Sequence, residues 1–291
     1  PNSDEFVEAA AKGLHHIPAP VRNALQQFMH RPPACGALLL DGLPVGDLPA
    51  TPPTPWGRIE KDLSSDLLLL TVAHALGHPM GYAAESKGLL TPHIVPTPGE
   101  SYRQVSTSSE VDLVFHTEGS YAHHKPRYLL LLCLRGDPAA ATTLAPVAHI
   151  LPLLDDHTRQ VLSQPRFRIA VDETYVQPGE RRLTPQLAAL TGDPADPQIV
   201  FDADLMEGAD DEAHQAFLRL CDAAVASRLD VVLSSGQMLV IDNHRTAHGR
   251  SAFTPRFDGT DRWMQRCFVM ADPTVSDGER SGRVITRPFG T

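Results

Sequence analysis

The sequence predicts a mainly β protein of the α+β class, an antiparallel sandwich or barrel with helical additions. Helical patterns gather near the start of the chain, short strand-like segments dominate the rest, and one late helix is inserted at 211–228. The 26 prolines are typical of many short elements joined by turns. No internal repeat and no clear linker divides the 291 residues, so we expect one domain over 1–291.

The first half of the chain combines helices, strands and a proline-rich loop. Residues 18–29 predict a short helix with proline in its first turn, and 63–77 predict an amphipathic helix that ends at a glycine. Between them we expect a buried strand at 34–45 and an extended loop at 49–56. Polar and apolar residues alternate within 102–116, which indicates a further strand.

The second half is richer in strands. The continuous apolar run at 126–137 predicts a central strand, and 211–228 has the most regular helical pattern. Residues 177–199 are polar and rich in Pro and Gly, and a loop of this length inside a compact domain is often a lid over an active site. The other expected strands lie at 166–176, 197–205, 230–233, 236–249 and 262–270.

Charge and composition argue against several classes of protein. Lys and Arg number 25 against 35 Asp and Glu, a net charge of −10, so we expect no nucleic-acid partner. No stretch approaches the roughly 20 apolar residues of a membrane span, and the first residues lack the pattern of a secretion signal. The four cysteines are far apart, which favours a reduced, cytoplasmic protein.

Two short motifs far apart in the sequence point to a metal site. In FHTEGSY, His116 and Glu118 are two residues apart, so on a strand both side chains face the same side. NHRTAHGR adds His248, and two histidines with one carboxylate suit Fe(II) and leave positions open for O₂ and a chelating cosubstrate. The alternative is that His116 is a hydrogen-bonded core residue. Other histidines compete for the same role: His74, His123, His124 and His244.

Two arginines follow His248 in the sequence. On a strand formed by RWMQR, Arg262 and Arg266 share one face, about 13 Å end to end at roughly 3.3 Å per residue. Inward guanidinium groups are costly unless each meets an anion, and an Arg fork suits a carboxylate. The alternative is that both pair with Asp258 and Asp261 in surface salt bridges.

Together these motifs resemble those of the clavaminate synthase-like oxygenases, which are Fe(II)- and 2-oxoglutarate-dependent enzymes related to taurine dioxygenase. The likeness covers roughly 34–270 and is greatest to hydroxylases of free arginine, lysine or asparagine. It implies a double-stranded β-helix (jelly roll) core with flanking N-terminal helices and an inserted helix. The segments that carry it are HTE at 116–118, PRYLLLLCLRGD at 126–137, HGR at 248–250 and FDGTDRW at 257–263.

The resemblance implies how the cofactors would be bound. The histidines of HTE and HGR, with Glu118, would hold Fe(II). Arg262 would hold the distal carboxylate of 2-oxoglutarate, helped by a threonine of AATTL. Its spacing from the HTE motif favours Thr143 over the adjacent Thr142.

The resemblance also implies contacts with a small amino-acid substrate. Arg266 matches the residue that clamps the α-carboxylate, and Ser106 matches a position near the carboxylate or amine. Glu85 matches a Gln or Glu that touches the α-amino group. Halogenating relatives carry a small residue where this chain has Glu118, so the resemblance favours hydroxylation.

Two carboxylates in VFDADLMEG suggest the type of substrate. Asp202 and Asp204 are two residues apart, and paired carboxylates suit a cationic side chain. The resemblance points the same way, so we expect hydroxylation at C3 or C4 of a free basic L-amino acid, lysine or arginine, with release of succinate and CO₂. The alternative is that both aspartates cap a turn or the helix at 211–228. Asp172 and Glu173 are reserve candidates.

Three rival functions stay open. The same chemistry could act on asparagine, ornithine or citrulline, or on a carrier-tethered amino acid, which would leave Arg266 without its anion. A zinc hydrolase could use the same three metal ligands but gives Arg262 no role. A non-enzymatic binding module would hold no transition metal.

Overall fold

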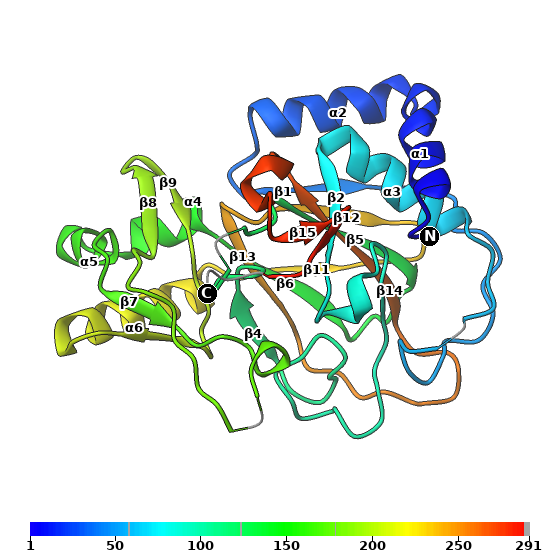
Figure 1. Ribbon diagram of the computed structural model, residues 1–291. Helices are drawn as coiled ribbons and strands as arrows, with labels where there is room; N and C mark the ends of the chain where they lie inside the picture. Colours follow the sequence, from blue (N-terminus) through cyan, green and yellow to red (C-terminus); the bar gives the residue numbers. More distant parts are fainter. Residues whose placement is uncertain (58, 123, 178, 288–291) are drawn as a thin grey trace.

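Two sheets form the centre of the molecule. The computed structural model describes residues 1–57, 59–122, 124–177 and 179–287. The large sheet has the order β1-β12-β5-β14-β2-β16-β15, with β3 also paired to β14, and the small sheet has the order β11-β6-β13-β4. Neighbouring strands are antiparallel except for β16 and β2. The structure therefore confirms a fold with extensive, mainly antiparallel sheets and helical additions, as expected from the sequence (Figure 1).

The large sheet consists of β1 (Ala37–Leu40), β2 (His78–Tyr82), β3 (His93–Ile94), β5 (Tyr128–Arg135), β12 (Met238–Asp242), β14 (Trp263–Met270), β15 (Arg280–Ser281) and β16 (Val284–Ile285). The small sheet consists of β4 (Leu113–His116), β6 (Ala141–Pro146), β11 (Leu229–Val232) and β13 (Thr246–Arg250).

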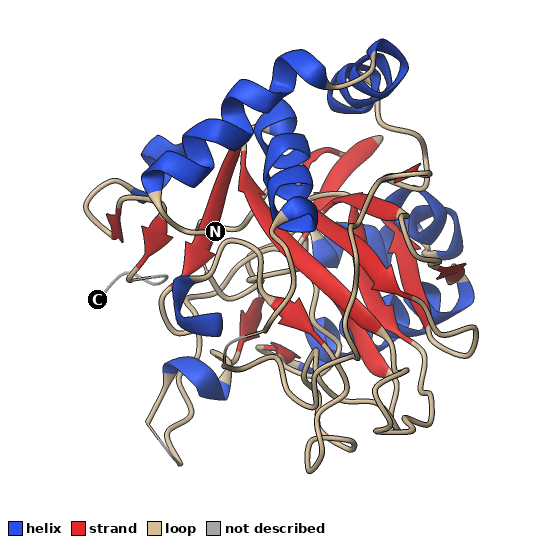
Figure 2. Cartoon of the chain, turned by 90° about the vertical axis from the view of Figure 1, so that its right-hand side faces the viewer, coloured by secondary structure: helices blue, strands red, loops and turns tan. Residues whose placement is uncertain are grey.

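Helices cover the outer side of each sheet (Figures 1 and 2). Three helices pack on the large sheet: α1 (Asp4–Lys12), α2 (Ala19–His30) and α3 (Ser64–Leu76). The small sheet carries α4 (Val147–Ile150), α5 (Asp156–Leu162) and α6 (Asp211–Ala226), with the strand pairs β7 (Phe167–Ile169)–β10 (Met206–Gly208) and β8 (Leu190–Asp193)–β9 (Asp196–Ile199). Short 3₁₀ helices span Gly13–His16, Ser86–Gly88, Leu151–Leu153, Glu173–Tyr175 and Pro273–Ser276.

β5 shows why a continuous apolar run was required at the centre of the fold. Successive side chains of a strand point to opposite faces. Leu130 and Leu132 pack on the outer side with α3, whereas Leu129 and Leu131 pack between the two sheets. Both faces of β5 are therefore buried, as the sequence predicted for 126–137.

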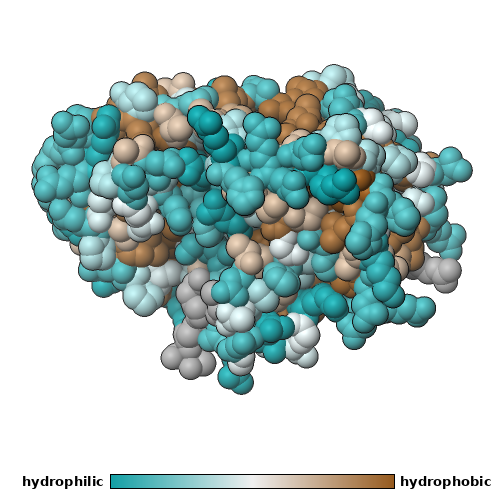
Figure 3. All heavy atoms as spheres, turned by 90° about the horizontal axis from the view of Figure 1, so that it is seen from above, coloured by the Kyte–Doolittle hydropathy of each residue, from teal (hydrophilic) through white to brown (hydrophobic). Residues whose placement is uncertain are grey.

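The N-terminal helices give the molecule a largely polar outer surface. α1, which the sequence analysis did not assign, is capped by Ser3, whose hydroxyl accepts a hydrogen bond from the N–H of Phe6. The helical side is mostly hydrophilic, with separate apolar patches (Figure 3). Within the described part of the chain, no helix combines the length and the apolar character needed to cross a bilayer.

One expected strand is much shorter than predicted. Of residues 102–116, only Leu113–His116 forms a strand. The preceding residues turn back on themselves, because the N–H groups of Ser109 and Glu110 both donate to the carbonyl of Ser101. Polar alternation in this segment therefore reflects a hydrogen-bonded loop.

Candidate active site

β4 and β13 bring the predicted metal ligands together. His116, the last residue of β4, lies opposite His248 of β13 in the antiparallel register, and their ring centroids are 4.4 Å apart. Glu118 follows two residues later, and its Oε2 lies 3.5 Å from Nε2 of His248. One ligand atom from each residue lies within 4.8 Å of the other two. Among the described residues, these three side chains form the only group that could hold one metal ion in this way.

The protonation states of the three residues suit metal binding. Nδ1 of His116 is 2.9 Å from the carbonyl of Val114, which can only accept, so Nδ1 carries the proton and Nε2 is free. Burial favours the neutral acid of Glu118, but Arg266 and the two histidines lower the pKa of this carboxyl to about 2. Burial and the neighbouring His116 lower the pKa of His248 to about 4. The site therefore offers Nε2 of His116, a neutral imidazole at His248 and an ionised Glu118 to a metal.

Asn243, which sequence reasoning missed, fixes the backbone of Glu118. It follows β12 and is almost completely buried. Its Oδ1 accepts from the N–H of Glu118 at 2.7 Å, and its Nδ2 donates to the carbonyls of Glu118 and Pro126 at 3.0 Å each. This one carboxamide therefore holds the metal-binding segment from a strand far away in the sequence. The only local signal was an Asn one residue beyond the apolar run of β12, after Asp242.

The competing histidines have other surroundings. His124 lies 3.0 Å from a carboxylate oxygen of Glu279, and Nδ1 of His244 lies 3.1 Å from a guanidinium nitrogen of Arg127. His74 belongs to α3, on the outer side of the large sheet. His123 lies outside the described residues.

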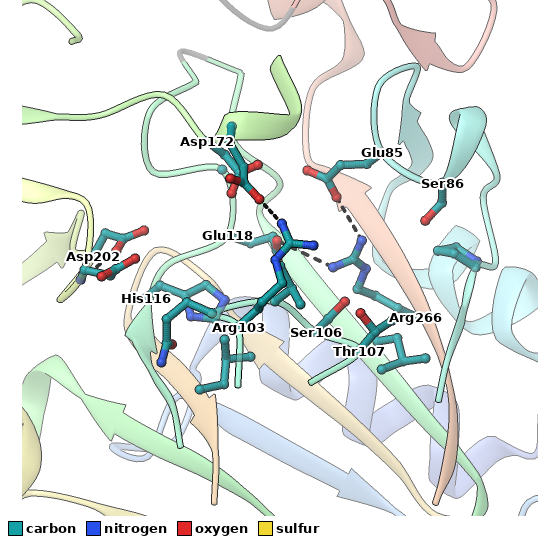
Figure 4. A pocket seen from close by; sticks show the side chains of 18 of the residues that line it. Glu85, Ser86, Arg103, Ser106, Thr107, His116, Glu118, Asp172, Asp202 and Arg266 are labelled. Atoms are coloured by element: carbon teal, nitrogen blue, oxygen red, sulfur yellow. Dashed lines mark hydrogen bonds and ion pairs between the residues drawn. The ribbon is translucent and has the colours of Figure 1, made fainter. Parts of the chain in front are cut away.

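Arg266 of β14 lies between two carboxylates, as Figure 4 shows. Its guanidinium is 2.8 Å from Oε2 of Glu85 and 3.7 Å from Oε1 of Glu118. The other oxygen of Glu85 accepts a 2.8 Å hydrogen bond from the hydroxyl of Tyr175. Burial raises the pKa of Glu85, although Arg266 acts in the opposite direction. A positive and a negative group thus stand side by side next to Glu118.

Arg262 contacts Thr142, not the expected Thr143. Its Nη2 lies 3.4 Å from Oγ1 of Thr142, while Oγ1 of Thr143 would lie 2.9 Å from a Cβ on Gly249. Adjacent residues of β6 face opposite sides of the sheet: Leu144 packs between the sheets and Ala145 packs on the outer lobe. Thr143, favoured by its spacing from the HTE motif, does not face Arg262, because the register of β6 decides which threonine faces inward.

The two arginines do not form the surface salt bridges that the sequence left open. Asp261 accepts from the backbone N–H of Arg256 at 2.7 Å, and the nearest ion pair of Asp258 is also with Arg256, at 3.9 Å. Arg262, directly before β14, and Arg266 of β14 are both buried.

A third arginine, Arg250, is also buried at this site and was not singled out from the sequence. It lies directly opposite Thr142 in the pairing of β13 with β6. Burial is the largest cause that lowers its pKa, to about 10, and the positive charge of Arg262 adds to the effect. The two guanidinium groups are therefore close enough to repel each other.

A cavity of about 660 Å³ opens beside these residues. Many of its walls are acidic, including Glu100, Asp172 and Glu173. Most of the predicted site residues line it: Glu85, Ser106, His116, Glu118, Asp202, Asp204 and Arg266. His248, Arg262 and Thr143 are not among its lining residues.

Asp202 caps a turn and also lines the cavity. Its Oδ1 accepts from the N–H groups of Asp204 and Leu205 at 3.0 and 2.9 Å, so it caps a turn. Its Oδ2 lies 3.4 Å from the hydroxyl of Ser120, and the side chain lines the cavity. Burial raises the pKa of Asp202, although His116 opposes this. Figure 4 shows Asp202 and Glu85 on opposite sides of the pocket.

The expected lid segment is partly a hairpin. β8 and β9 occupy its second half, and Ala189, Leu190 and Ile199 are buried in the cluster beneath α6. Among the described residues of 177–199, none lines the cavity. The segment just before it does: Asp172 and Glu173 are lining residues, and Glu173 pairs with Arg103. Closure of 177–199 over a substrate stays a prediction.

Comparisons with known proteins agree with this site. Residues 69–268 match the family described as "Taurine catabolism dioxygenase TauD, TfdA family". The chain is 37% identical to the L-asparagine oxygenase of Streptomyces coelicolor, over 94% of this chain and 82% of that protein. It is 34% identical to the L-lysine 3-hydroxylase of Catenulispora acidiphila, over 98% and 82%. It is also 34% identical to clavaminate synthase 2 of Streptomyces clavuligerus, over 97% and 89%.

A solved structure gives the same result for the fold. The crystal structure of an asparagine oxygenase in complex with Fe(II), 3-hydroxyasparagine and succinate superposes with a TM-score of 0.92 at 35% identity. The match covers 98% of this chain and 91% of that one. The chain therefore belongs to the TauD/TfdA family and is an Fe(II)- and 2-oxoglutarate-dependent oxygenase of the clavaminate synthase-like group.

Proposed function

We propose that this enzyme hydroxylates C3 or C4 of a free basic L-amino acid, lysine or arginine, and releases succinate and CO₂. The observation that carries the proposal is the arrangement of charges around the metal ligands. Arg266 and Glu85 lie side by side next to Glu118, and the buried Asp202 lies on the opposite side of the cavity. These charges complement the carboxylate, amine and cationic side chain of one small molecule.

The pair formed by Arg266 and Glu85 suits the α-carbon end of an amino acid. A guanidinium fork binds a carboxylate, and a carboxylate accepts from an ammonium group. A zwitterionic amino acid carries a carboxylate and an ammonium group. On binding, its carboxylate can pair with Arg266 and its ammonium group with Glu85, so two ion pairs replace the one between Arg266 and Glu85. Ser106, which also lines the cavity, would assist at the carboxylate. With the α-carbon end of the substrate fixed in this way, its β or γ carbon would face the metal.

The metal would be bound at β4 and β13, and the cosubstrate would contact β6 and the residue directly before β14. His116, Glu118 and His248 would hold Fe(II), and the free Nε2 of His116 and the ionised Glu118 fit this role. Arg262, with Thr142 in place of the expected Thr143, would hold the distal carboxylate of 2-oxoglutarate. Bound Fe(II) supplies the activation of O₂ that oxidises 2-oxoglutarate and the substrate carbon. The protein supplies orientation and a water-poor site.

Asp202 supports a cationic substrate. Only Oδ1 is used by the turn that it caps, so Oδ2 is available to a guanidinium or ammonium group. Asp204 and Asp172 add negative charge around the same cavity. A relative named as an L-lysine 3-hydroxylase is consistent with this assignment. The strand order of the two sheets likewise supports the double-stranded β-helix that the sequence resemblance implies.

Asparagine is the second candidate, because a relative at 37% identity is an L-asparagine oxygenase. Its neutral amide would leave the charge of Asp202 without a cation. Ornithine, citrulline and a carrier-tethered amino acid are further alternatives, and a thioester would leave Arg266 without the anion proposed for it.

The proposal is tested by incubating the protein with Fe(II), 2-oxoglutarate and each free amino acid in turn. We expect lysine or arginine to gain one oxygen by mass spectrometry, with one succinate formed per product. Preferred turnover of asparagine would overturn the basic substrate but keep the chemistry. No succinate from fully iron-loaded enzyme across the panel, ornithine and citrulline included, would contradict the function itself.

A further inference from the structure

Arg250 is not used by the function proposed above, although it belongs to the HGR motif that supplies His248. On β13, residues two apart face the same side, so Arg250 and His248 both face inward. Thr142 lies directly opposite Arg250 on β6 and accepts from the guanidinium of Arg262. Arg262 therefore bonds the side chain of the residue that lies opposite Arg250 in the pairing of β13 with β6.

Neutral groups accept all the hydrogen bonds of Arg250. Its guanidinium donates to the carbonyls of Ser109, Val111 and Ser251 and to the hydroxyl of Ser108, at 2.9–3.1 Å. Arg262 donates to the neutral hydroxyl of Thr142. Within the described residues, neither arginine has a carboxylate oxygen at ion-pair distance. Both side chains are buried, at 4% and 8% exposure.

Two buried positive charges close together are unfavourable unless an anion binds beside them. Asp112 attracts Arg250 and Asp137 attracts Arg262, but neither carboxylate reaches ion-pair distance. One carboxylate at Arg262 would neutralise only one of the two positive charges. The hydrogen bonds to carbonyls hold the guanidinium of Arg250 in place, so it contributes its charge without touching the ligand. Its positive charge would attract the distal carboxylate of a cosubstrate bound at Arg262.

We propose that Arg250 is a positioning residue that supplies the second positive charge of a dianion site, and so makes the enzyme select 2-oxoglutarate over 2-oxo acids with one carboxylate. The inference rests on the proposed function, because it takes Arg262 as the contact for the distal carboxylate. Arg250 acts on the distal carboxylate of 2-oxoglutarate through its charge, without contacting it.

A purely structural role makes a different prediction. Arg250 ties the loop at 108–111 to β13, and the neighbouring residues Ser106 and Thr107 line the cavity. If this were its whole role, replacing it would weaken the binding of every oxo acid alike. If its charge matters, only the acid with a distal carboxylate loses affinity.

The test compares 2-oxoglutarate with 2-oxopentanoate, which has a methyl group in place of the distal carboxylate. Binding of both is measured by calorimetry on protein loaded with Zn(II), which does not turn over. We expect Arg250→Met to reduce the ratio of the two affinities about tenfold, or about 1.4 kcal/mol. Arg250→Lys keeps the charge and should retain the ratio within about twofold. Ser108→Ala removes one of the hydrogen bonds of Arg250, together with the bond from the Ser108 hydroxyl to the carbonyl of Val105, and should leave the ratio unchanged.

An equal loss of affinity for both acids in Arg250→Met would overturn the proposal. If Arg250→Met fails to fold, the folded Arg250→Lys variant decides. A ratio of the two affinities well below the wild-type ratio would overturn the proposal, and a retained ratio supports the proposal. Thermal stabilisation of metal-free protein by glutarate is a readout independent of turnover: it should be larger in the wild type than in Arg250→Lys and smallest in Arg250→Met. An enzyme that forms no succinate but keeps this order would contradict the proposed function and leave the dianion site standing.

Discussion

The side chain of Asn243 hydrogen-bonds to both backbone polar groups of Glu118. The carboxamide accepts from the N–H and donates to the carbonyl of the same residue, as a neighbouring strand would. A carboxylate two residues beyond the end of β4 would otherwise depend on an irregular segment for its position. Asn243 therefore orients a metal ligand without touching the metal.

Asn243→Asp tests this role with a change of one atom. The carboxylate loses both donated hydrogen bonds and places oxygen against the carbonyls of Glu118 and Pro126. Loss of such an outer partner typically reduces metal affinity about 10–100-fold, and we expect a reduction in that range for Mn(II), titrated into metal-free protein by calorimetry.

The matched control is Leu132→Ala, a fully buried change on the outer side of the large sheet. It should reduce the free energy of unfolding by about 2–5 kcal/mol and leave Mn(II) affinity unchanged. Equal metal affinity in Asn243→Asp and the wild type would show that the hydrogen bonds do not matter for the site.

Thr142→Val and Thr143→Val form a pair that separates inward from outward side chains on β6. Thr142 accepts from Arg262, and removing its hydroxyl costs about 1 kcal/mol, so KM for 2-oxoglutarate should rise about fivefold. Thr143→Val should leave this KM unchanged. Steady-state succinate formation measures both, and the reverse order would restore the assignment expected from the sequence.

Asp202→Asn keeps the shape of the side chain and removes its charge. Its Oδ1 can still cap the turn, so the fold should survive. Loss of a charged hydrogen-bond partner is worth about 1.5–3 kcal/mol, so kcat/KM for a basic amino acid should fall about 10–100-fold. Turnover of asparagine should change little. Unchanged selectivity in a panel with lysine, arginine and asparagine would remove Asp202 from the site.

Tyr175→Phe removes the hydroxyl that donates a hydrogen bond to Glu85. A freer Glu85 should bind the substrate amine less well, so KM for the amino acid should rise about fivefold. More succinate should then form without product, which chromatography of both products measures. Tyr102→Phe is the control, because Tyr102 also bonds a glutamate but is exposed. Identical behaviour of the two variants would argue against a role for Tyr175.

Local patterns predicted much of the fold and part of the site. The spacing of His116 and Glu118 was sufficient to place both on one side, and the apolar run of β5 marked a strand buried on both faces. Local spacing could not predict the pairing of His116 with His248, because this pairing depends on the register between β4 and β13. The motif implied their proximity only through its resemblance to a family.

The errors have the same origin in pairing and turns. Thr142 and Thr143 are equally good candidates until the register of β6 is known. Within 177–199, Asp193 and Asp196 close a short hairpin turn around Pro194 and Ala195. A composition rich in Pro and Gly was interpreted as one long loop, although it also suits a tight turn between two strands.

The segment between β6 and β11 leaves and re-enters the small sheet at two hydrogen-bonded neighbours, with Leu144 opposite Leu229. Its two ends therefore sit side by side, and it carries Asp172, Glu173 and Asp202, whereas His116, Glu118 and His248 lie outside it. The segment between β6 and β11 can therefore be exchanged between related enzymes without altering the strand order around the metal ligands. Chimaeras of two related enzymes joined at 146 and 229 should therefore catalyse the reaction of the parent that supplies the metal ligands. They should prefer the substrate side chain that is selected by the parent that supplies the segment between β6 and β11.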